Sequence, residues 1–267
     1  MNNIFTVISY NIWFDDSLTA ERTSSLIHII DNTNPDVICF QEVRPNVYAF
    51  LINILNNYRY HFPKKISKGY DCAIFSKYPI TKCLEHRFEN STMGRSLLIT
   101  KIDYPYHEKT EDGISIDKIE LVVTTTHFES LFKKKDINHT KIEQFEITSR
   151  ILEQLYECFR NVLLCADTNV LRHEEHKFNE YFDDNCWLDS WKEKGSSILC
   201  EYTYDSEYNV YLQNRFPNVK YKSRIDRIMY KGDNLLLEEF SLLKGNGKII
   251  EPSDHFGICS KFVVIKK

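Results

Sequence analysis

Residues 162–170 read VLLCADTNV, and this stretch joins a strongly apolar run to an abrupt polar end. Val162 to Ala166 are all apolar and predict a buried strand. Asp167 and Asn169 follow that strand directly. In layered α/β folds, ligand sites are built at strand ends and in the loops that follow them. The stretch therefore predicts both a core strand and one part of a functional site.

The length and composition of the chain indicate one globular domain over residues 1–267. Of the 267 residues, 42% are hydrophobic and 27% are charged, close to the globular average. A domain of this size buries about 70–75% of the surface of its unfolded chain. No internal repeat, proline-rich linker or low-complexity block marks a domain boundary in the sequence.

Charge and cysteine usage limit the setting in which the protein works. The formal net charge of −4 gives no overall attraction to nucleic acid or to an anionic membrane, so a polyanionic partner requires a local basic patch. The eight cysteines lack any C-x-x-C pair, which indicates small buried side chains in a reducing compartment. The sequence shows neither a signal-peptide pattern nor an apolar run of membrane-spanning length. We expect a monomeric intracellular protein without membrane association, in the nucleus or the cytoplasm.

Strands and helices are predicted from the spacing of apolar residues. Helical patterns cover 18–32, 47–55 and 136–159. The stretch from Tyr104 to Asp117 lacks clear periodicity and is predicted to be a loop. Strands alternate with helices in places and follow one another directly elsewhere, which favours an α/β sandwich with antiparallel pairs over a purely parallel sheet. The predicted strands cover 5–10, 36–40, 72–76, 96–102, 119–126, 161–166, 224–230 and 257–265.

Polar side chains gather at the ends of five of these strands. Taken singly, such residues are usually turn formers or solvated side chains. Together they supply carboxylate and amide oxygens and no thiolate, which suits Mg²⁺ or Mn²⁺. Carboxylates brought this close would repel one another without a cation. The residues concerned are Asn11, Gln41, Glu42, His127, Ser130, Asp167, Asn169, Asp254 and His255.

The motifs SYNIW, FQEV, THFES, DTN, SRIDR and SDH, in this order, resemble the endonuclease/exonuclease/phosphatase superfamily. The resemblance covers residues 5–264. It implies a four-layer α/β sandwich of two mixed β-sheets flanked by helices, as in DNase I, and the cleavage of phosphoester bonds with Mg²⁺ or Mn²⁺. MGRSLLITKI (93–102), EYTYD (201–205) and PSDHFGI (252–258) are most similar to members that hydrolyse 5′-phosphotyrosyl–DNA bonds in DNA repair and leave a 5′-phosphate.

The resemblance also implies roles for the residues that hold the metal and the attacking water. Glu42 would be the main metal ligand, with Asn11 beside it and Asp254 reaching the ion directly or through water. Asp167 would orient and deprotonate the attacking water. Asn169 would hold that water or a phosphate oxygen.

Four further residues would contact or orient the phosphate. His255 would donate to a non-bridging phosphate oxygen, with Asp226 of SRIDR keeping its ring in orientation. His127 and Ser130 would complete the phosphate cradle. These roles suit phosphoryl transfer, which depends on positioning and charge neutralisation rather than on a covalent nucleophile.

Arg95, Arg172 and Tyr204 are the remaining substrate-binding residues that the resemblance implies. Arg172 stands later after DTN than its counterpart does, and Tyr204 replaces a tryptophan but keeps a face on which a base can stack. Ala166 stands where the superfamily usually has glycine before the aspartate. These departures concern the substrate and leave the chemistry unchanged.

The leaving group fits a site with one metal and no obvious second acid. A tyrosine phenol has a pKa of about 10, whereas the pKa of a sugar alcohol lies nearer the roughly 15.7 of water. Release of a phenol therefore needs less help from a general acid.

The expected partners are DNA 5′ ends that carry tyrosine or a topoisomerase peptide, with RNA–protein linkages also considered. Alternative functions are an abasic-site endonuclease or general nuclease, a phosphoinositide or sphingolipid phosphoesterase, and a non-catalytic binding module.

Overall fold

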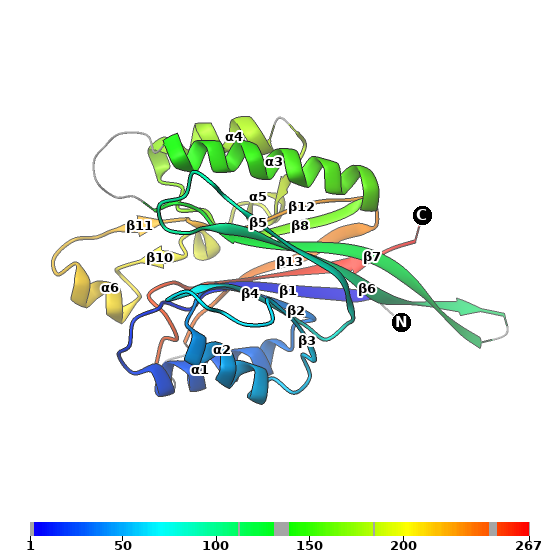
Figure 1. Ribbon diagram of the computed structural model, residues 1–267, viewed down its shortest axis with the longest axis horizontal. Coiled ribbons are helices and arrows are strands. Elements are labelled where there is room, and N and C mark those ends of the chain that lie inside the picture. Colours follow the sequence, from blue (N-terminus) through cyan, green and yellow to red (C-terminus); the bar gives the residue numbers. More distant parts are fainter. Residues whose placement is uncertain (1–2, 112, 131–138, 184, 246–249, 267) are drawn as a thin grey trace.

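Strand β8 (Asn161–Asp167), which contains the whole apolar stretch at 162–166, lies inside the second of two six-stranded sheets. The computed structural model describes residues 3–111, 113–130, 139–183, 185–245 and 250–266. The two sheets pack face to face, with α1 and α2 covering the first and α3 and α4 covering the second (Figure 1). The expected sandwich of two mixed sheets flanked by helices is therefore confirmed.

The first sheet has the strand order β13-β14-β1-β2-β4-β3. Its strands β1 and β2 are parallel, and its other pairs are antiparallel. The bounds are β1 Ile4–Asn11, β2 Val37–Val43, β3 Tyr60–Phe62, β4 Asp71–Ser76, β13 Leu235–Leu243 and β14 Gly257–Val264, with helices α1 Thr19–Thr33 and α2 Pro45–Ile54.

The second sheet has the order β5-β6-β7-β8-β12-β9, and β7 and β8 are its parallel pair. A separate two-stranded sheet pairs β10 with β11. The bounds are β5 Ile80–Arg87, β6 Ser96–Thr110, β7 Gly113–His127, β9 Leu188–Asp189, β10 Tyr204–Asp205, β11 Lys222–Ser223 and β12 Asp226–Gly232. The remaining helices are α3 His139–Phe159, η1 Arg172–Glu174, α4 Glu175–Phe182, α5 Ser190–Glu193, η2 Ile198–Cys200 and α6 Val210–Arg215.

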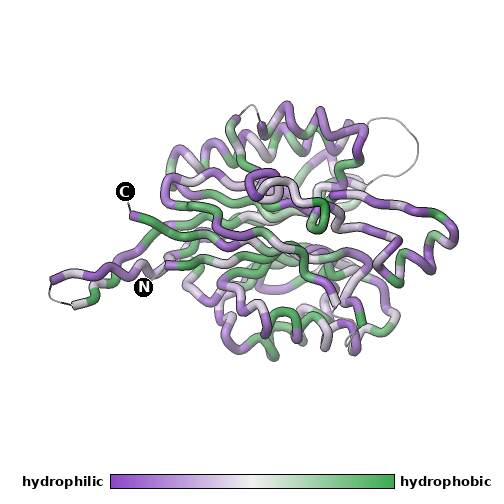
Figure 2. The backbone as a smooth tube through the Cα atoms, turned by 180° about the vertical axis from the view of Figure 1, so that it is seen from behind, coloured by the Kyte–Doolittle hydropathy of each residue, from purple (hydrophilic) through white to green (hydrophobic). Residues whose placement is uncertain are grey.

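Three apolar clusters fill the three interfaces between these four layers. In β8, Leu163 and Cys165 belong to the cluster between the sheets. Val162, Leu164 and Ala166 belong to the cluster under α3 and α4. Because successive side chains point to opposite faces of a strand, a strand buried on both faces has to be apolar throughout. Figure 2 shows hydrophobic segments following the strands through the middle of the molecule.

The prediction of a loop over 104–117 is wrong, because strands β6 and β7 extend into this segment as a long hairpin (Figure 1). Tyr106 pairs with Asp117 and Lys109 pairs with Ile114. This part of the hairpin is largely solvent-exposed, with Ile116 67% exposed, so no buried face imposes an alternating pattern on its sequence. The apolar spacing also did not predict strands β5 and β13, of which β5 is largely exposed and β13 mostly half-buried.

The predicted helices are present, with small shifts at their ends. The first two run from Thr19 to Thr33 and from Pro45 to Ile54, and the third runs from His139 to Phe159. Residues 136–138 of the third predicted helix lie outside the described residues. Among the helices that the structure describes, none has the length and apolar character needed to cross a membrane.

Candidate active site

Three neighbouring strands of the second sheet present polar side chains at one edge. His127 pairs with Asp167 across β7 and β8, and Asp167 pairs with Asp226 across β8 and β12. By the two-residue alternation of a strand, Asp167 lies on the same face as Leu163 and Cys165, which faces the first sheet. All three polar side chains are at least 97% buried. The backbone ladder therefore fixes their spacing.

Asn11 connects this row to the first sheet. It ends β1 on the face that Phe5 and Val7 turn toward the second sheet. Its Nδ2 donates to Asp167 Oδ2 at 2.8 Å, and its Oδ1 accepts from the Trp13 main-chain N–H at 3.0 Å. The predicted meeting of these strand ends is thus observed directly.

Glu42 reaches the site through irregular backbone. Regular alternation along β2 would turn it away from the second sheet, since Gln41 already faces that sheet and donates to Thr125 Oγ1 at 2.9 Å. The pairing of β2 with β4 slips between Phe40 and Val43, and Glu42 has a φ of 59°. A non-glycine residue held in this region is uncommon and is found preferentially at functional sites. The bulge brings Glu42 Oε1 to 3.9 Å from His127 Nδ1.

Asp254 and His255 enter from the loop before β14 and are both buried. His255 Nδ1 lies 2.9 Å from Asp226 Oδ2, and its Nε2 lies 4.0 Å from Asp167 Oδ2. The Tyr204 ring packs edge-on against the imidazole, with 5.0 Å between ring centroids. The imidazole is thus held from two sides, with Nε2 turned toward Asp167.

The site contains several groups with shifted pKa values. Burial, and then the neighbouring Asp226, raise the pKa of Asp167 to about 7. Burial first and Asp254 second raise the pKa of Glu42 above its ordinary value. Burial alone would lower the pKa of His255, but Asp226, Asp167 and Asp254 raise it well above its ordinary value. Strongly shifted groups in one cluster are typical of catalytic sites.

His127 is neutral in this environment. Burial, the Arg95 guanidinium and His255 hold the pKa of His127 well below its ordinary value. Arg95 NH1 lies 2.9 Å from Nδ1 of the ring, and Asp167 Oδ2 lies 3.3 Å from Nε2. A neutral imidazole can accept from the arginine and donate to the carboxylate, so both contacts are compatible.

Asn169 is fixed beside Asp167. Its main-chain N–H donates to Asp167 Oδ1 at 3.0 Å, and its side-chain Nδ2 donates to the Phe128 carbonyl at 3.0 Å. The buried Lys141 of α3 donates to the Asn169 carbonyl at 2.6 Å. Asn169 therefore lies next to the carboxylate, as its predicted role requires, although its side chain is bonded to the main chain.

Two of the predicted substrate-binding residues have their described contacts with other residues than these carboxylates and histidines. Ser130 donates its hydroxyl to Met93 Sδ at 3.4 Å, and the residues after it, 131–138, lie outside the described residues. Arg172 is exposed in η1 and lines a groove of about 670 Å³ together with Tyr202 and Tyr221. Arg95 and Tyr204, by contrast, contact the histidines at the centre of the site.

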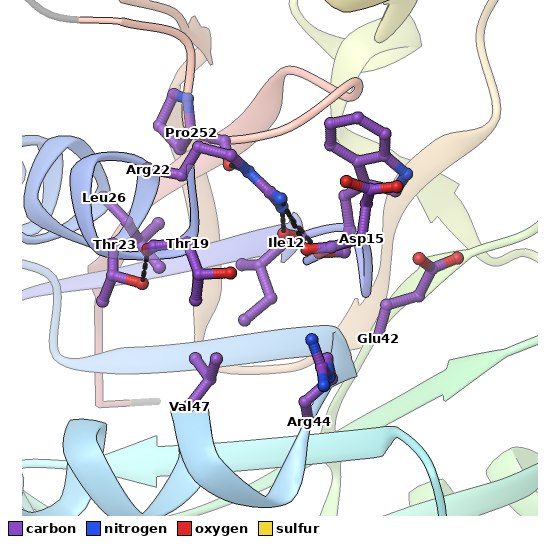
Figure 3. Close-up of a pocket in the computed structure, with 11 residues that line it drawn as sticks. Ile12, Asp15, Thr19, Arg22, Thr23, Leu26, Glu42, Arg44, Val47 and Pro252 are labelled. Carbon is purple, nitrogen blue, oxygen red and sulfur yellow. Dashed lines mark hydrogen bonds between the residues drawn. The ribbon is translucent and has the colours of Figure 1, made fainter. Parts of the chain in front are cut away.

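Several residues at the site had no sequence signal that distinguished them. Phe14 and Tyr70 stack at 4.6 Å between ring centroids, and Tyr70 adjoins Arg95. Arg22 of α1 is buried and lines the same pocket as Glu42 (Figure 3).

The chain matches the model of the Endonuclease/Exonuclease/phosphatase family over residues 8–128. It is 28% identical to tyrosyl-DNA phosphodiesterase 2 of Bos taurus, over 98% of this chain and 69% of that protein. It is 25% identical to the 5′-tyrosyl-DNA phosphodiesterase of Caenorhabditis elegans, over 96% of this chain and 66% of that protein.

Among solved structures, the chain is similar to that of D. rerio TDP2 complexed with a single-strand DNA product. The TM-score is 0.81, with 22% sequence identity over 98% of this chain and 99% of the other. The family match and the sequence relatives confirm the predicted resemblance to the superfamily, and the solved structure confirms the DNase I-like sandwich. The chain is homologous to tyrosyl-DNA phosphodiesterase 2 along almost its whole length.

Proposed function

We propose that this homologue of tyrosyl-DNA phosphodiesterase 2 hydrolyses 5′-phosphotyrosyl–DNA bonds in DNA repair, leaving a 5′-phosphate and free tyrosine or peptide. The observation that carries the proposal is the position of Asp167. It is a buried carboxyl with a pKa raised to about 7, held by Asn11 and by the Asn169 N–H beside the His255–Asp226 pair. A base with a pKa near the working pH is the most effective proton acceptor.

The residues divide the work of phosphoryl transfer among them. Asp167 accepts the proton of the attacking water. His255, protonated and oriented by Asp226, donates from Nε2 to a phosphate oxygen. The His127–Arg95 pair adds a positive charge beside the same phosphate. Donors fixed before the reaction stabilise developing charge without reorganising.

Glu42 and Asp254 are the residues that would hold a divalent cation. Both carboxylates are largely enclosed: burial raises the pKa of each, and Asp254 raises that of Glu42 further, so ionising both is costly. A divalent cation held by both would offset that cost, and an all-oxygen donor set suits Mg²⁺ or Mn²⁺. When bound, the ion neutralises charge on the phosphoryl oxygens.

A second set of potential ligands, Asp167, Asp226 and His255, has ligand atoms within 4.8 Å of one another. His255 Nδ1 is already engaged by Asp226 at 2.9 Å, and the raised pKa means that the ring retains its protons. A protonated imidazole does not ligate a cation. This trio therefore serves proton transfer better than metal binding.

The proposal takes residues 1–267 as one catalytic domain that acts as an intracellular monomer on DNA 5′ ends carrying tyrosine or a topoisomerase peptide. RNA–protein linkages are a related substrate that the same site would accept. Arg95 and Tyr204 contact the catalytic histidines and are placed to meet the phosphate and the adjoining base. Arg172, Ser130 and Asn169 would extend these contacts along the substrate.

The test is hydrolysis of a 5′-phosphotyrosyl oligonucleotide by the purified protein with Mg²⁺, with Mn²⁺ and with EDTA. We expect release of tyrosine and a 5′-phosphorylated product with either metal, and none with EDTA. Abasic duplex DNA and inositol phosphates are the comparison substrates. No release of tyrosine, or faster turnover of either comparison substrate, would reject the proposal.

A further inference from the structure

Arg22 of α1 uses its full hydrogen-bonding capacity on the main chain. A guanidinium has five N–H donors, and here each of the five donates to a different carbonyl. Figure 3 shows Arg22 beside Ile12, Asp15 and Pro252, which carry three of these carbonyls. The side chain is only 4% exposed. The acceptors are the carbonyls of Ile12 at 2.6 Å, Trp13 at 2.6 Å, Asp15 at 2.8 Å, Ser17 at 3.2 Å and Pro252 at 2.9 Å.

These carbonyls belong to two separate loops that each hold part of the site. Four lie in the loop between β1 and α1, whose Phe14 N–H donates to Glu42 Oε2 at 3.0 Å. The fifth, that of Pro252, precedes Asp254 by two residues. Arg22 therefore connects the loop that supports Glu42 to the loop that carries Asp254.

The charge of Arg22 is held without a close carboxylate. Within the described ranges, no carboxylate oxygen lies within 4.0 Å of the guanidinium. The Trp13 ring lies against it at 4.5 Å and the Tyr211 ring at 5.9 Å from its central carbon. A buried charge is costly unless it is fully hydrogen-bonded. Only an arginine supplies five donors in a planar fork and also stacks on an aromatic ring.

We infer that Arg22 is a positioning residue for the metal site: it fixes the separation of Glu42 and Asp254 by holding their two loops together. The inference rests on the proposed function, because it assumes that these carboxylates share a cation. Residues that orient metal ligands typically change metal affinity by about 10- to 100-fold when mutated. A purely structural role would instead lower thermal stability and leave the affinity of the folded protein unchanged.

The experiment measures Mn²⁺ binding to the whole chain without substrate, from the EPR signal of free Mn²⁺. In Arg22→Met we expect the dissociation constant to rise about 10-fold or more. Arg22→Lys keeps the charge but has three donors for five carbonyls, so we expect a smaller rise in the same direction. In activity assays, excess Mn²⁺ should restore most of kcat in both variants.

Arg227→Met is the matched control. Arg227 is also fully buried, but it pairs with Glu175 and Asp189 on the face of the second sheet that turns away from the first. We expect it to lower Tm by at least as much as the Arg22 variants do, with Mn²⁺ affinity unchanged. If Arg22→Met does not fold, Arg22→Lys alone decides the outcome.

Wild-type Mn²⁺ affinity in a folded Arg22 variant, or an equal loss of affinity in Arg227→Met, would overturn the inference. Either result would leave the proposed function in place, provided that the wild-type protein binds Mn²⁺ and releases tyrosine. Failure of the wild-type protein to bind Mn²⁺ would overturn both the metal-dependent mechanism and the role of Arg22.

Discussion

The two sheets contribute to the site in different ways. The second sheet presents His127, Asp167 and Asp226 in register on three paired strands. The first sheet contributes Glu42 from a bulge and Asp254 from a loop. Strand register sets the positions of His127, Asp167 and Asp226. Individual hydrogen bonds, such as those from the Phe14 N–H and from Arg22, hold Glu42 and the loop of Asp254 instead.

The difference indicates a division of labour. Groups that move protons need constant geometry, and a strand ladder in the middle of a sheet provides it. Carboxylates that take up a cation have to tolerate both the empty and the occupied state, which a loop allows more readily than a central strand. Substituting Asp167 of the second sheet should therefore change kcat, and substituting Glu42 of the first should change metal affinity.

The largest expected effect is that of Asp167→Asn, which removes the proposed proton acceptor. We expect kcat on the phosphotyrosyl substrate to fall by about 10²- to 10⁴-fold, the usual contribution of a general base. Mn²⁺ affinity should change little, because Asp167 belongs to the other half of the site. Rapid-quench kinetics with saturating Mn²⁺ would measure the rate, and a parallel loss of Mn²⁺ affinity would remove the distinction between the halves.

Glu42→Gln should show the opposite profile. The substitution preserves shape but removes one of two carboxylates that would hold the cation, so we expect Mn²⁺ affinity to fall about 10- to 100-fold. Activity should recover in part as Mn²⁺ is raised. A metal titration of activity and of Mn²⁺ binding tests this, and a fall in kcat that no Mn²⁺ concentration reverses would contradict it.

The stability of the metal-free protein should depend on the ionisation of Asp167. Its folded pKa of about 7 lies above the ordinary value of 3.8, so the folded state holds the proton more tightly than the unfolded chain does. The contribution of this carboxyl to stability is therefore complete below about pH 4 and is lost as the pH rises through 7. Urea unfolding in EDTA should show that the free energy of unfolding of the wild type falls between these pH values relative to that of Asp167→Asn. A difference between the two proteins that stays constant with pH would disprove the raised pKa of Asp167.

The smallest effect should come from Glu175, which lies on the outer face of the second sheet. Burial alone would raise its pKa, but Arg227 and Arg224 lower it to about 2. The contribution of the Glu175 carboxylate to stability is present at pH values above its ordinary pKa of 4.5 and is lost as the pH falls toward 2.

Since Glu175 is partly exposed, we expect Glu175→Gln to cost about 1 kcal/mol at neutral pH, with Mn²⁺ affinity unchanged. Urea unfolding at pH 7 and pH 3 checks this, because the cost should shrink at the lower pH. An equal cost at both values would show that the carboxylate charge contributes nothing.

The sequence predicted those parts of the fold and site that depend on burial or on a motif. The apolar run before Asp167 identifies a strand with two buried faces, and the motifs locate the polar residue at each strand end. The hairpin over 104–117 was missed because much of it is solvent-exposed, so no buried face imposes an alternating pattern on its sequence. Glu42 was found by its motif, although alternation along β2 would have turned it away from the site.

Arg22 was missed for a different reason. Its partners are main-chain carbonyls, which every residue has, so no spacing of side-chain types reveals them. Lys141 likewise contacts the Asn169 carbonyl from a distant helix, in addition to its ion pair with Glu174. Residues that act on the backbone of a site become visible only when the loops are placed in space.

The most direct test of the account is single-turnover release of tyrosine from a 5′-phosphotyrosyl oligonucleotide by wild-type protein and Asp167→Asn, both saturated with Mn²⁺. We predict release and a 5′-phosphorylated product from the wild type, and at least about 100-fold slower release from the variant, whose Mn²⁺ binding is intact. Equal rates for the two proteins, or no release by the wild type, would contradict the central claim.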